Sequence, residues 1–223
     1  MINDFIRFMQ EGGIFMYFIA AVFLIGLAVC AERWVYLQNA KTGNRKAWDD
    51  VFPHLRKGDL KTAVAIAGDS KTSVGNMISF GVSTMLTAKG LIDRRHLPAV
   101  EMAMEESLME VTPKLEKRTP YVALLANVAT LLGLLGTIVG LIDAFAAVAA
   151  ADPAEKGAML SRSIAVAMNT TALGLIAAIP LMLFHALLTT KTTEVVDSLE
   201  MAGVKIMNLI RHSEEGSGSG NDD

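Results

Sequence analysis

Three uncharged apolar runs alternate along this chain with stretches in which charged and apolar residues are mixed. The runs cover residues 13–31, 121–142 and 163–190, so each has about the 20 apolar residues that cross the hydrocarbon core of a bilayer. Elsewhere apolar residues recur at helical intervals, as in Val51 and Leu55. The pattern predicts an all-α membrane protein with three transmembrane helices and a large helical domain outside the membrane.

Turn and cap residues indicate where several helices begin or break. Gly58-Asp59 interrupts the helical pattern, and Asp59 is suited to cap a helix that begins at Leu60. Pro120 falls in the first turn of the second span, where proline is well tolerated. Pro180 falls inside the third span and predicts a kink or a loosened hydrogen-bond ladder. We expect some helices to continue from the membrane into the polar domain.

Small residues form a stripe along each of the last two spans at helical spacing. The stripe consists of Ala126, Thr130, Gly133, Thr137, Gly140 and Ala144 on the second span, and of Ala167, Thr171, Gly174 and Ala178 on the third. Small residues let helix backbones approach closely in lipid. Gly133, Gly140, Gly174 and Ala178 are therefore predicted to be helix-packing positions.

Basic residues gather at one end of the three spans. They are Arg33, Lys41, Arg45 and Lys46 after the first span, Lys114, Lys117 and Arg118 before the second, and Lys191 after the third. The opposite ends carry only Arg7, Lys156 and Arg162. Because the cytoplasmic flanks of membrane helices are rich in Lys and Arg, we predict a periplasmic N-terminus and a cytoplasmic C-terminus.

This orientation divides the chain into eight predicted segments. They are a periplasmic interfacial helix at 1–12, transmembrane helices at 13–37, 120–150 and 163–190, a cytoplasmic helical domain at 38–119, a periplasmic turn at 151–162, a cytoplasmic C-terminal helix at 191–212 and a disordered tail at 213–223. Whether the Gly/Ser-rich tail is native stays open.

The composition excludes several classes of protein. Hydrophobic residues make up 52% and charged residues 19% of the chain, which fits membrane spans plus a polar part. The net charge of −3 gives no indication of a nucleic-acid partner. The apolar runs make membrane lipids an expected partner. Cys30 is the single cysteine and is predicted to be a small packing residue. No metal-ligand spacing or phosphate-binding loop occurs, so we expect neither an enzyme nor a bound cofactor.

Polar side chains are costly inside a membrane, so those within the spans are candidate functional residues. The candidates singled out among them are Thr137, Asn169, Thr170, Thr171 and His185. A threonine can also hydrogen-bond its own helix, and an asparagine can bridge neighbouring helices. For His185, near one end of its span, an interfacial position is the alternative. The stripes alone are thus compatible with a pore lining and with tight packing.

Two segments of the last two spans resemble the MotA/TolQ/ExbB family, ion-channel subunits of bacterial inner-membrane motors. They are Pro120-Tyr121 with Leu132-Gly-Leu-Leu-Gly-Thr-Ile-Val-Gly140 and Ala144-Phe145, and Ala165-Val-Ala-Met-Asn-Thr-Thr-Ala-Leu-Gly-Leu-Ile-Ala-Ala-Ile-Pro180. Glu32-Arg33 after the first span and Gly58-Asp59 also agree. The resemblance covers nearly the whole chain after Gly12.

The resemblance implies a homo-oligomer, expected to be a ring-shaped pentamer, in the bacterial inner membrane. Its central channel would hold the single spans of a dimeric ExbD/TolR-like partner, each with a membrane carboxylate. Ion flow past that carboxylate would drive rotation of one assembly against the other. By position, Thr137 and Thr171 correspond to the threonines of the family's second and third spans, and both would offer hydroxyls along the ion route.

The sequence departs from ExbB and TolQ at Val166, because those relatives carry Glu five residues before the third-span threonine. Val166 shares a helical face with Asn169 and Thr170, three and four residues later. A neutral amide and a hydroxyl therefore stand where these relatives use an acid, and both join the predicted ion pathway. The MotA branch also lacks this Glu, so a working channel is still expected.

Several alternatives stay open from sequence. The transported ion is H⁺ or Na⁺, and the machine that it powers serves uptake, envelope maintenance, secretion or motility. A non-conducting membrane scaffold or assembly subunit is the alternative function. A substrate transporter is disfavoured because the chain shows neither paired repeats nor a substrate-sized polar site.

Overall fold

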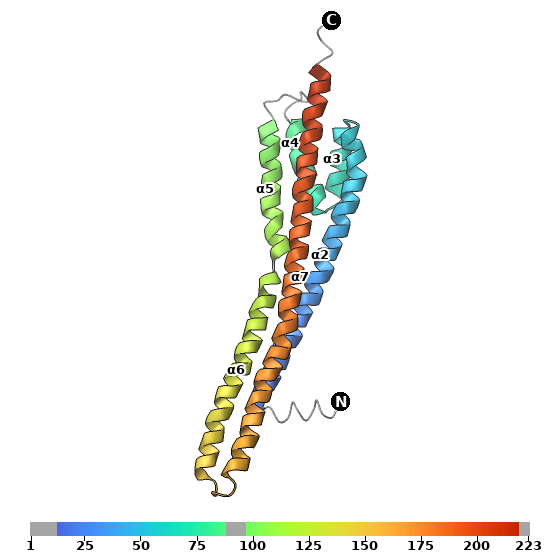
Figure 1. Cartoon of the computed structure of the whole chain (residues 1–223). Helices are drawn as coiled ribbons and strands as arrows, with labels where there is room; N and C mark the ends of the chain where they lie inside the picture. Colours follow the sequence, from blue (N-terminus) through green and yellow to red (C-terminus); the bar gives the residue numbers. More distant parts are fainter. Residues whose placement is uncertain (1–12, 88–96, 219–223) are drawn as a thin grey trace. The chain divides into compact units, whose positions relative to one another are not determined.

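The structure, a computed structural model, describes residues 13–87 and 97–218, and every regular element within these ranges is a helix (Figure 1). The elements are α2 (Ile14–Arg56), α3 (Leu60–Asp69), α4 (Ser73–Thr87), α5 (Leu97–Glu116), α6 (Thr119–Ala150) and α7 (Lys156–Gly218). The interfacial helix predicted at 1–12 lies outside the described residues.

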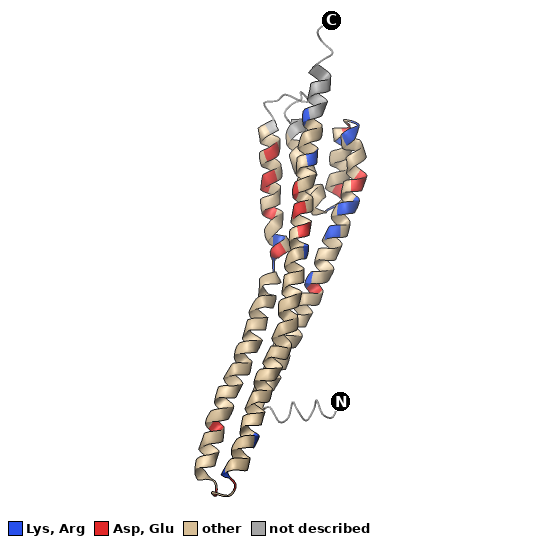
Figure 2. Ribbon diagram, viewed as in Figure 1, with Lys and Arg blue, Asp and Glu red and all other residues tan. Residues whose placement is uncertain are grey.

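Three of the helical stretches are long and apolar enough to cross a membrane, and they lie within Ile14–Arg56, Pro98–Ala150 and Lys156–Arg211. The predicted all-α fold with three long apolar helices is therefore confirmed. At 43 and 63 residues, α2 and α7 are much longer than the roughly 20 residues of a span. Both helices thus extend beyond their apolar runs, as predicted, and their charges gather outside these runs (Figure 2).

The chain forms two compact units. One, here called the membrane-helix unit, consists of Met1–Arg33 and Arg118–Thr189, and the other, here called the charged unit, consists of Trp34–Lys117 and Thr190–Asp223. The core of the membrane-helix unit buries Met16 and Ile19 of α2, Val122 and Ala126 of α6, and Leu181 of α7. Apolar contacts among three helices therefore hold this unit together.

The core of the charged unit is built from helices whose opposite faces are polar. Buried side chains come from α2 (Leu37), α4 (Met77), α5 (Leu115) and α7 (Leu199 and Ile206). The side chain of Asn44 is also buried, and its Oδ1 accepts a hydrogen bond from the Val74 N–H at 3.2 Å. This bond joins α2 to the start of α4.

Polar contacts also join α2 and α7 within the charged unit. The Lys191 ammonium lies 3.5 Å from the centroid of the Trp34 ring and donates to Gln38 Oε1 at 3.1 Å. Lys41 donates to Glu194 at 2.7 Å, and this hydrogen bond lowers the pKa of the Glu194 carboxyl. Because this ion pair is exposed, its contribution to stability is small.

The predicted cap at Asp59 is confirmed. Its Oδ1 accepts a hydrogen bond from the Thr62 N–H at 3.2 Å at the start of α3, and hydrogen bonding from Thr62 lowers the pKa of the Asp59 carboxyl. Pro120 falls in the first turn of α6, as predicted. Pro180 lies inside α7, which is helical on both sides of it.

The break between α5 and α6 falls at Arg118. This residue has a left-handed backbone with φ of 70°, a conformation that costs a non-glycine residue about 1–2 kcal/mol. Its Nη1 lies 3.2 Å from Oε2 of Glu32 near the end of the apolar run of α2. The ion pair links the start of α6 to α2 within the membrane-helix unit.

Candidate functional site

Gly133 on α6 and Gly174 on α7 mark a close approach of two helices in the membrane-helix unit. A Cβ atom added to Gly174 would lie 2.8 Å from the Ala129 carbonyl oxygen and 3.0 Å from the Gly133 Cα. A Cβ atom added to Gly133 would lie 3.2 Å from the Cα atoms of Gly174 and Thr171. These neighbours are backbone atoms, which cannot turn aside, so only glycine fits without moving a helix.

The small-residue stripes of α6 and α7 extend this contact in both directions. A Cβ atom on Gly140 would lie 3.2 Å from the Ala167 Cβ, and Ala178 is 2% exposed. Ala126 and Ala144 are also buried, whereas Thr130 is exposed. The stripes predicted from the sequence therefore lie largely in the interior of the membrane-helix unit.

Two hydroxyl groups meet inside the contact. Thr171 Oγ1 donates to the Gly133 carbonyl oxygen at 2.9 Å, and Thr137 Oγ1 lies 3.1 Å from the same oxygen. The two hydroxyls also hydrogen-bond each other, and Thr137 Oγ1 lies 3.5 Å from the Ala167 carbonyl oxygen. Hydroxyl and carbonyl oxygens from both helices thus form one connected group, here called the hydroxyl cluster.

The hydroxyl cluster contains no carboxylate, which limits its chemistry. Each hydroxyl can donate one hydrogen bond and accept two, so the group can pass on a hydrogen bond or offer oxygen atoms to a cation. It has no group that would itself bind and release a proton near neutral pH.

The other predicted polar residues are placed differently. Thr170 is 2% exposed, donates to the Val166 carbonyl oxygen at 3.3 Å and lies against Gly136 of α6. Asn169 is partly exposed, and among the described residues no hydrogen bond joins its amide to the hydroxyl cluster. Thr137 and Thr171 are therefore brought together, Thr170 is enclosed, and Asn169 is accessible from outside the chain.

The remaining ionisable and metal-binding candidates do not join this site. His185 is partly exposed and Asp143 is exposed. Within residues 13–87 and 97–218, no three His, Cys, Asp or Glu side chains are grouped so as to hold a metal ion. Cys30 is buried at 5% exposure, consistent with a packing residue.

Two further close contacts were not singled out from the sequence. A Cβ atom on Gly136 would clash with Thr170 and lie 3.2 Å from the Phe15 Cβ of α2, and one on Gly26 would lie 2.7 Å from Cδ2 of Leu181. Gly136 lies three residues after Gly133 and four residues before Gly140. This helical spacing could have shown that Gly136 lies on the packing face of α6. Gly26 has no such partner in its own span.

Comparison with known proteins decides the family. The profile of the MotA/TolQ/ExbB proton channel family matches residues 70–201, which include α6, the close glycine contact and both threonines of the hydroxyl cluster. The chain belongs to this proton channel family. The family assigned from the segments around Thr137 and Thr171 is therefore confirmed.

A named relative agrees with this assignment. The chain is 27% identical over 194 residues to an ExbB homolog, a biopolymer transport protein of Methanothermobacter thermautotrophicus. The aligned region covers 86% of this chain and 65% of the relative. Together with three apolar helices long enough to span, membership of the channel family makes this chain a membrane protein.

Proposed function

We propose that this chain is the channel-forming subunit of an inner-membrane motor that couples the proton- or sodium-motive force to mechanical work. The observation that carries the proposal is the hydroxyl cluster of Thr137 and Thr171, which lies in apolar spans within the region matched by the channel family. Hydroxyls are costly in lipid unless they serve packing or an ion route. Membership of a channel family favours the ion route.

In this proposal the chain supplies neutral oxygens and a partner supplies the acid. Val166 occupies the position at which ExbB and TolQ carry Glu, so the spans α6 and α7 offer hydroxyls near the ion but no carboxylate beside them. Asn169, which is partly exposed, would offer its amide to the same route. Such oxygens can replace part of the hydration shell of Na⁺ or support proton transfer to a carboxylate.

The proposed assembly is a pentamer around a single-span, ExbD/TolR-like dimer. The N-terminus would be periplasmic, and residues 38–119 and 191–212 would be cytoplasmic, because basic residues gather at that end of the spans. The small-residue stripes support close helix packing, since helices in lipid associate mainly through such contacts. Asn169 would then face a neighbouring chain.

The partner can be tested by co-purification. The chain, tagged and co-expressed with a single-span protein that is encoded nearby and has one membrane Asp, should retain that protein through detergent purification. Native mass analysis should give more than two copies of this chain per complex. A partner variant with its span replaced by polyleucine of equal length is the control and should not be retained. Recovery of this chain without the partner would contradict the proposed coupling.

The orientation can be tested with two cysteines in a Cys30→Ala background. A cysteine at the exposed Asp69 should resist an impermeant thiol reagent in intact cells, whereas one at the exposed Ala154 should react. Both should react after the cells are permeabilised, which controls for accessibility. The reverse pattern in intact cells would overturn the proposed topology.

A non-conducting scaffold is the second candidate function, and one observation favours it. The two hydroxyls satisfy each other and the Gly133 carbonyl inside the α6–α7 contact, as residues that serve only packing would. The scaffold predicts that removal of the hydroxyls leaves function intact. The channel function predicts instead that removing the hydroxyls of Thr137 and Thr171 abolishes function.

A further inference from the structure

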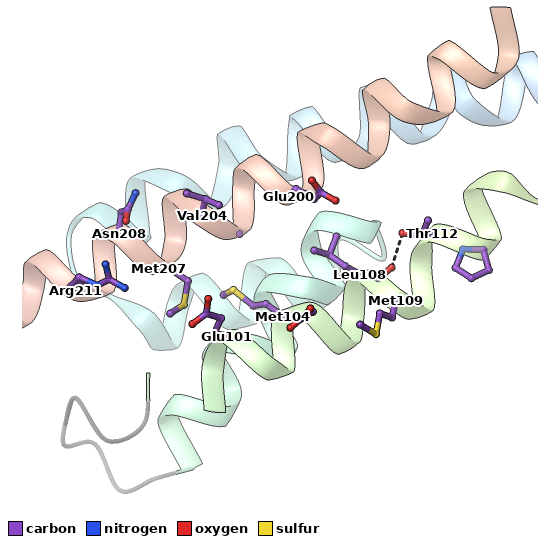
Figure 3. A pocket seen from close by; sticks show the side chains of 13 residues that line it. Glu101, Met104, Leu108, Met109, Thr112, Glu200, Val204, Met207, Asn208 and Arg211 are labelled. Carbon is purple, nitrogen blue, oxygen red and sulfur yellow. Dashed lines mark hydrogen bonds between the residues drawn. The ribbon is translucent and has the colours of Figure 1, made fainter. Parts of the chain in front are cut away.

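A groove of about 770 Å³ lies between α5 and α7 within the charged unit (Figure 3). Its apolar lining is contributed by Met104, Leu108 and Met109 of α5 and by Val204 and Met207 of α7, and Met104 and Met207 point toward one another across it. Gly203 also lines the groove and has no side chain to fill it. The groove is therefore a hollow between two helices with a soft, methionine-rich lining.

Part of the apolar lining is exposed, in a unit whose surface is otherwise largely charged and polar. Met109 is 67% and Val204 61% exposed. Contiguous exposed apolar surface on a polar domain marks an interaction site, and methionine-lined grooves are suited to receive a helix. The groove therefore indicates a binding surface for a helix of another chain.

The charges around the groove define the chemistry of its occupant. Glu101, Glu105 and Glu200 line it and are exposed, and Arg211 is the basic residue of the lining (Figure 3). Three glutamates against one arginine give the lining a net negative charge. A basic helix would be attracted to this surface, and an acidic segment would be repelled. Residues 213–223 contain four acidic residues and no basic one, so the tail of the chain does not suit the groove.

A basic helix face of the required kind occurs on α2 of the same unit. Arg45, Lys46 and Arg56 are exposed there. Asp49 and Asp50 are exposed on the same stretch, so its net charge is positive but small. This face lies at the level of the groove along the unit, because Lys205 of α7, between the groove residues Val204 and Met207, is 5.8 Å from the Trp48 ring of α2. In a ring whose symmetry axis is parallel to the helices, residues at the same height on adjacent copies lie side by side.

We propose that the groove between α5 and α7 receives the basic face of α2, around Arg45 and Lys46, from an adjacent copy of this chain. The inference rests on the oligomer of the proposed function and assigns one of its contacts. The groove and the α2 face are different surfaces, so the contact is head-to-tail. A head-to-tail contact continues from copy to copy and forms a ring when the rotation between copies closes, whereas a contact between identical surfaces stops at a dimer.

Disulfide cross-linking in membranes tests the contact directly. In a Cys30→Ala background, Asp49→Cys on α2 is combined with Val204→Cys at the groove, and both original residues are exposed. Oxidation should give a ladder of products beyond the dimer. Asp49→Cys combined with Phe80→Cys, at an exposed position of α4 outside the groove, is the control and should give little product.

Charge reversal tests whether the acidic side chains of the groove attract the basic side chains of α2 on the adjacent copy. Glu101→Lys with Glu105→Lys should reduce the cross-linked product several-fold, because like charges would then face each other. Adding Arg45→Glu and Lys46→Glu should restore it. Glu106→Lys with Glu110→Lys is the matched control, since these glutamates lie on α5 but line a different hollow. This control should leave the ladder unchanged.

The outcomes separate this inference from the proposed function. A ladder that is lost and restored by the paired reversals supports the contact. An intact oligomer without the ladder, or without restoration, overturns the inference and leaves the channel proposal standing. Products that stop at the dimer also overturn the head-to-tail contact. A monomer in native mass analysis would instead contradict the oligomer on which both rest.

Discussion

Replacing Gly174 with leucine is expected to abolish assembly of the membrane-helix unit. The Cβ atom alone would lie 2.8 Å from the Ala129 carbonyl oxygen and 3.0 Å from the Gly133 Cα, so α6 and α7 would have to separate. Overpacking in a well-packed interior costs about 1–3 kcal/mol, and more when the clash is with backbone. We expect the leucine variant to form no folded oligomer in detergent. We expect Gly174→Ala to lower the free energy of unfolding by about 1–3 kcal/mol.

The controls for this prediction use one glycine in open surroundings and one whose neighbour is a flexible side chain. A Cβ atom on Gly157 of α7 meets nothing within 4 Å, so Gly157→Leu should assemble as the wild type does. Gly26→Ala should cost less than Gly174→Ala, because its clash is with the flexible end of the Leu181 side chain. Native mass analysis and thermal unfolding in detergent measure both effects. Normal assembly of Gly174→Leu would contradict the close contact of α6 and α7.

Removing both hydroxyls of the cluster, with Thr137→Val and Thr171→Val together, is expected to abolish flux-dependent work and leave assembly intact. Valine keeps the shape of threonine, and replacing both partners of a hydrogen bond by apolar groups of the same shape is nearly neutral for stability. The Gly133 carbonyl oxygen would lose its two side-chain donors but would remain part of the backbone of α6. The ion, in contrast, would lose two oxygen atoms along its route.

The measurement is growth or transport that depends on the motor, in cells that express the partner, across pH and Na⁺ concentration. Asn169→Leu should also impair function, and more than Val166→Ala, because Asn169 has a polar side chain and Val166 has none. Val166→Glu should be tolerated or should change the preference for H⁺ or Na⁺, because a buried acid has a raised pKa. Full activity of the double threonine variant would support the scaffold.

Much of the helical framework follows from local patterns in the sequence. The apolar runs predict the three spanning helices, and the small-residue stripes predict which faces of α6 and α7 are buried. Asp59 and Pro120 mark helix starts because capping and proline geometry act within one turn. These features depend on residues that are close along the chain, so the sequence alone is sufficient to predict them.

Contacts between distant segments could not be predicted in this way. The clash at Gly26 depends on Leu181 of α7, and the groove depends on how α5 packs beside α7 within the charged unit. Likewise, the stripe pattern placed Thr137 and Thr171 on facing helices but did not show that their hydroxyls bond to each other and to Gly133. Such details depend on the relative rotation of packed helices, which periodicity does not determine.

Ion flux through reconstituted vesicles tests the central claim most directly. The complex of this chain with its co-purified single-span partner is placed in vesicles, a K⁺ diffusion potential is imposed, and dyes report internal pH and Na⁺. We predict potential-driven entry of H⁺ or Na⁺ that is lost when the partner's membrane Asp is changed to Asn or when Thr137→Val is combined with Thr171→Val. Flux no greater than in protein-free vesicles, from a complex that native mass analysis shows to be intact, would contradict the account.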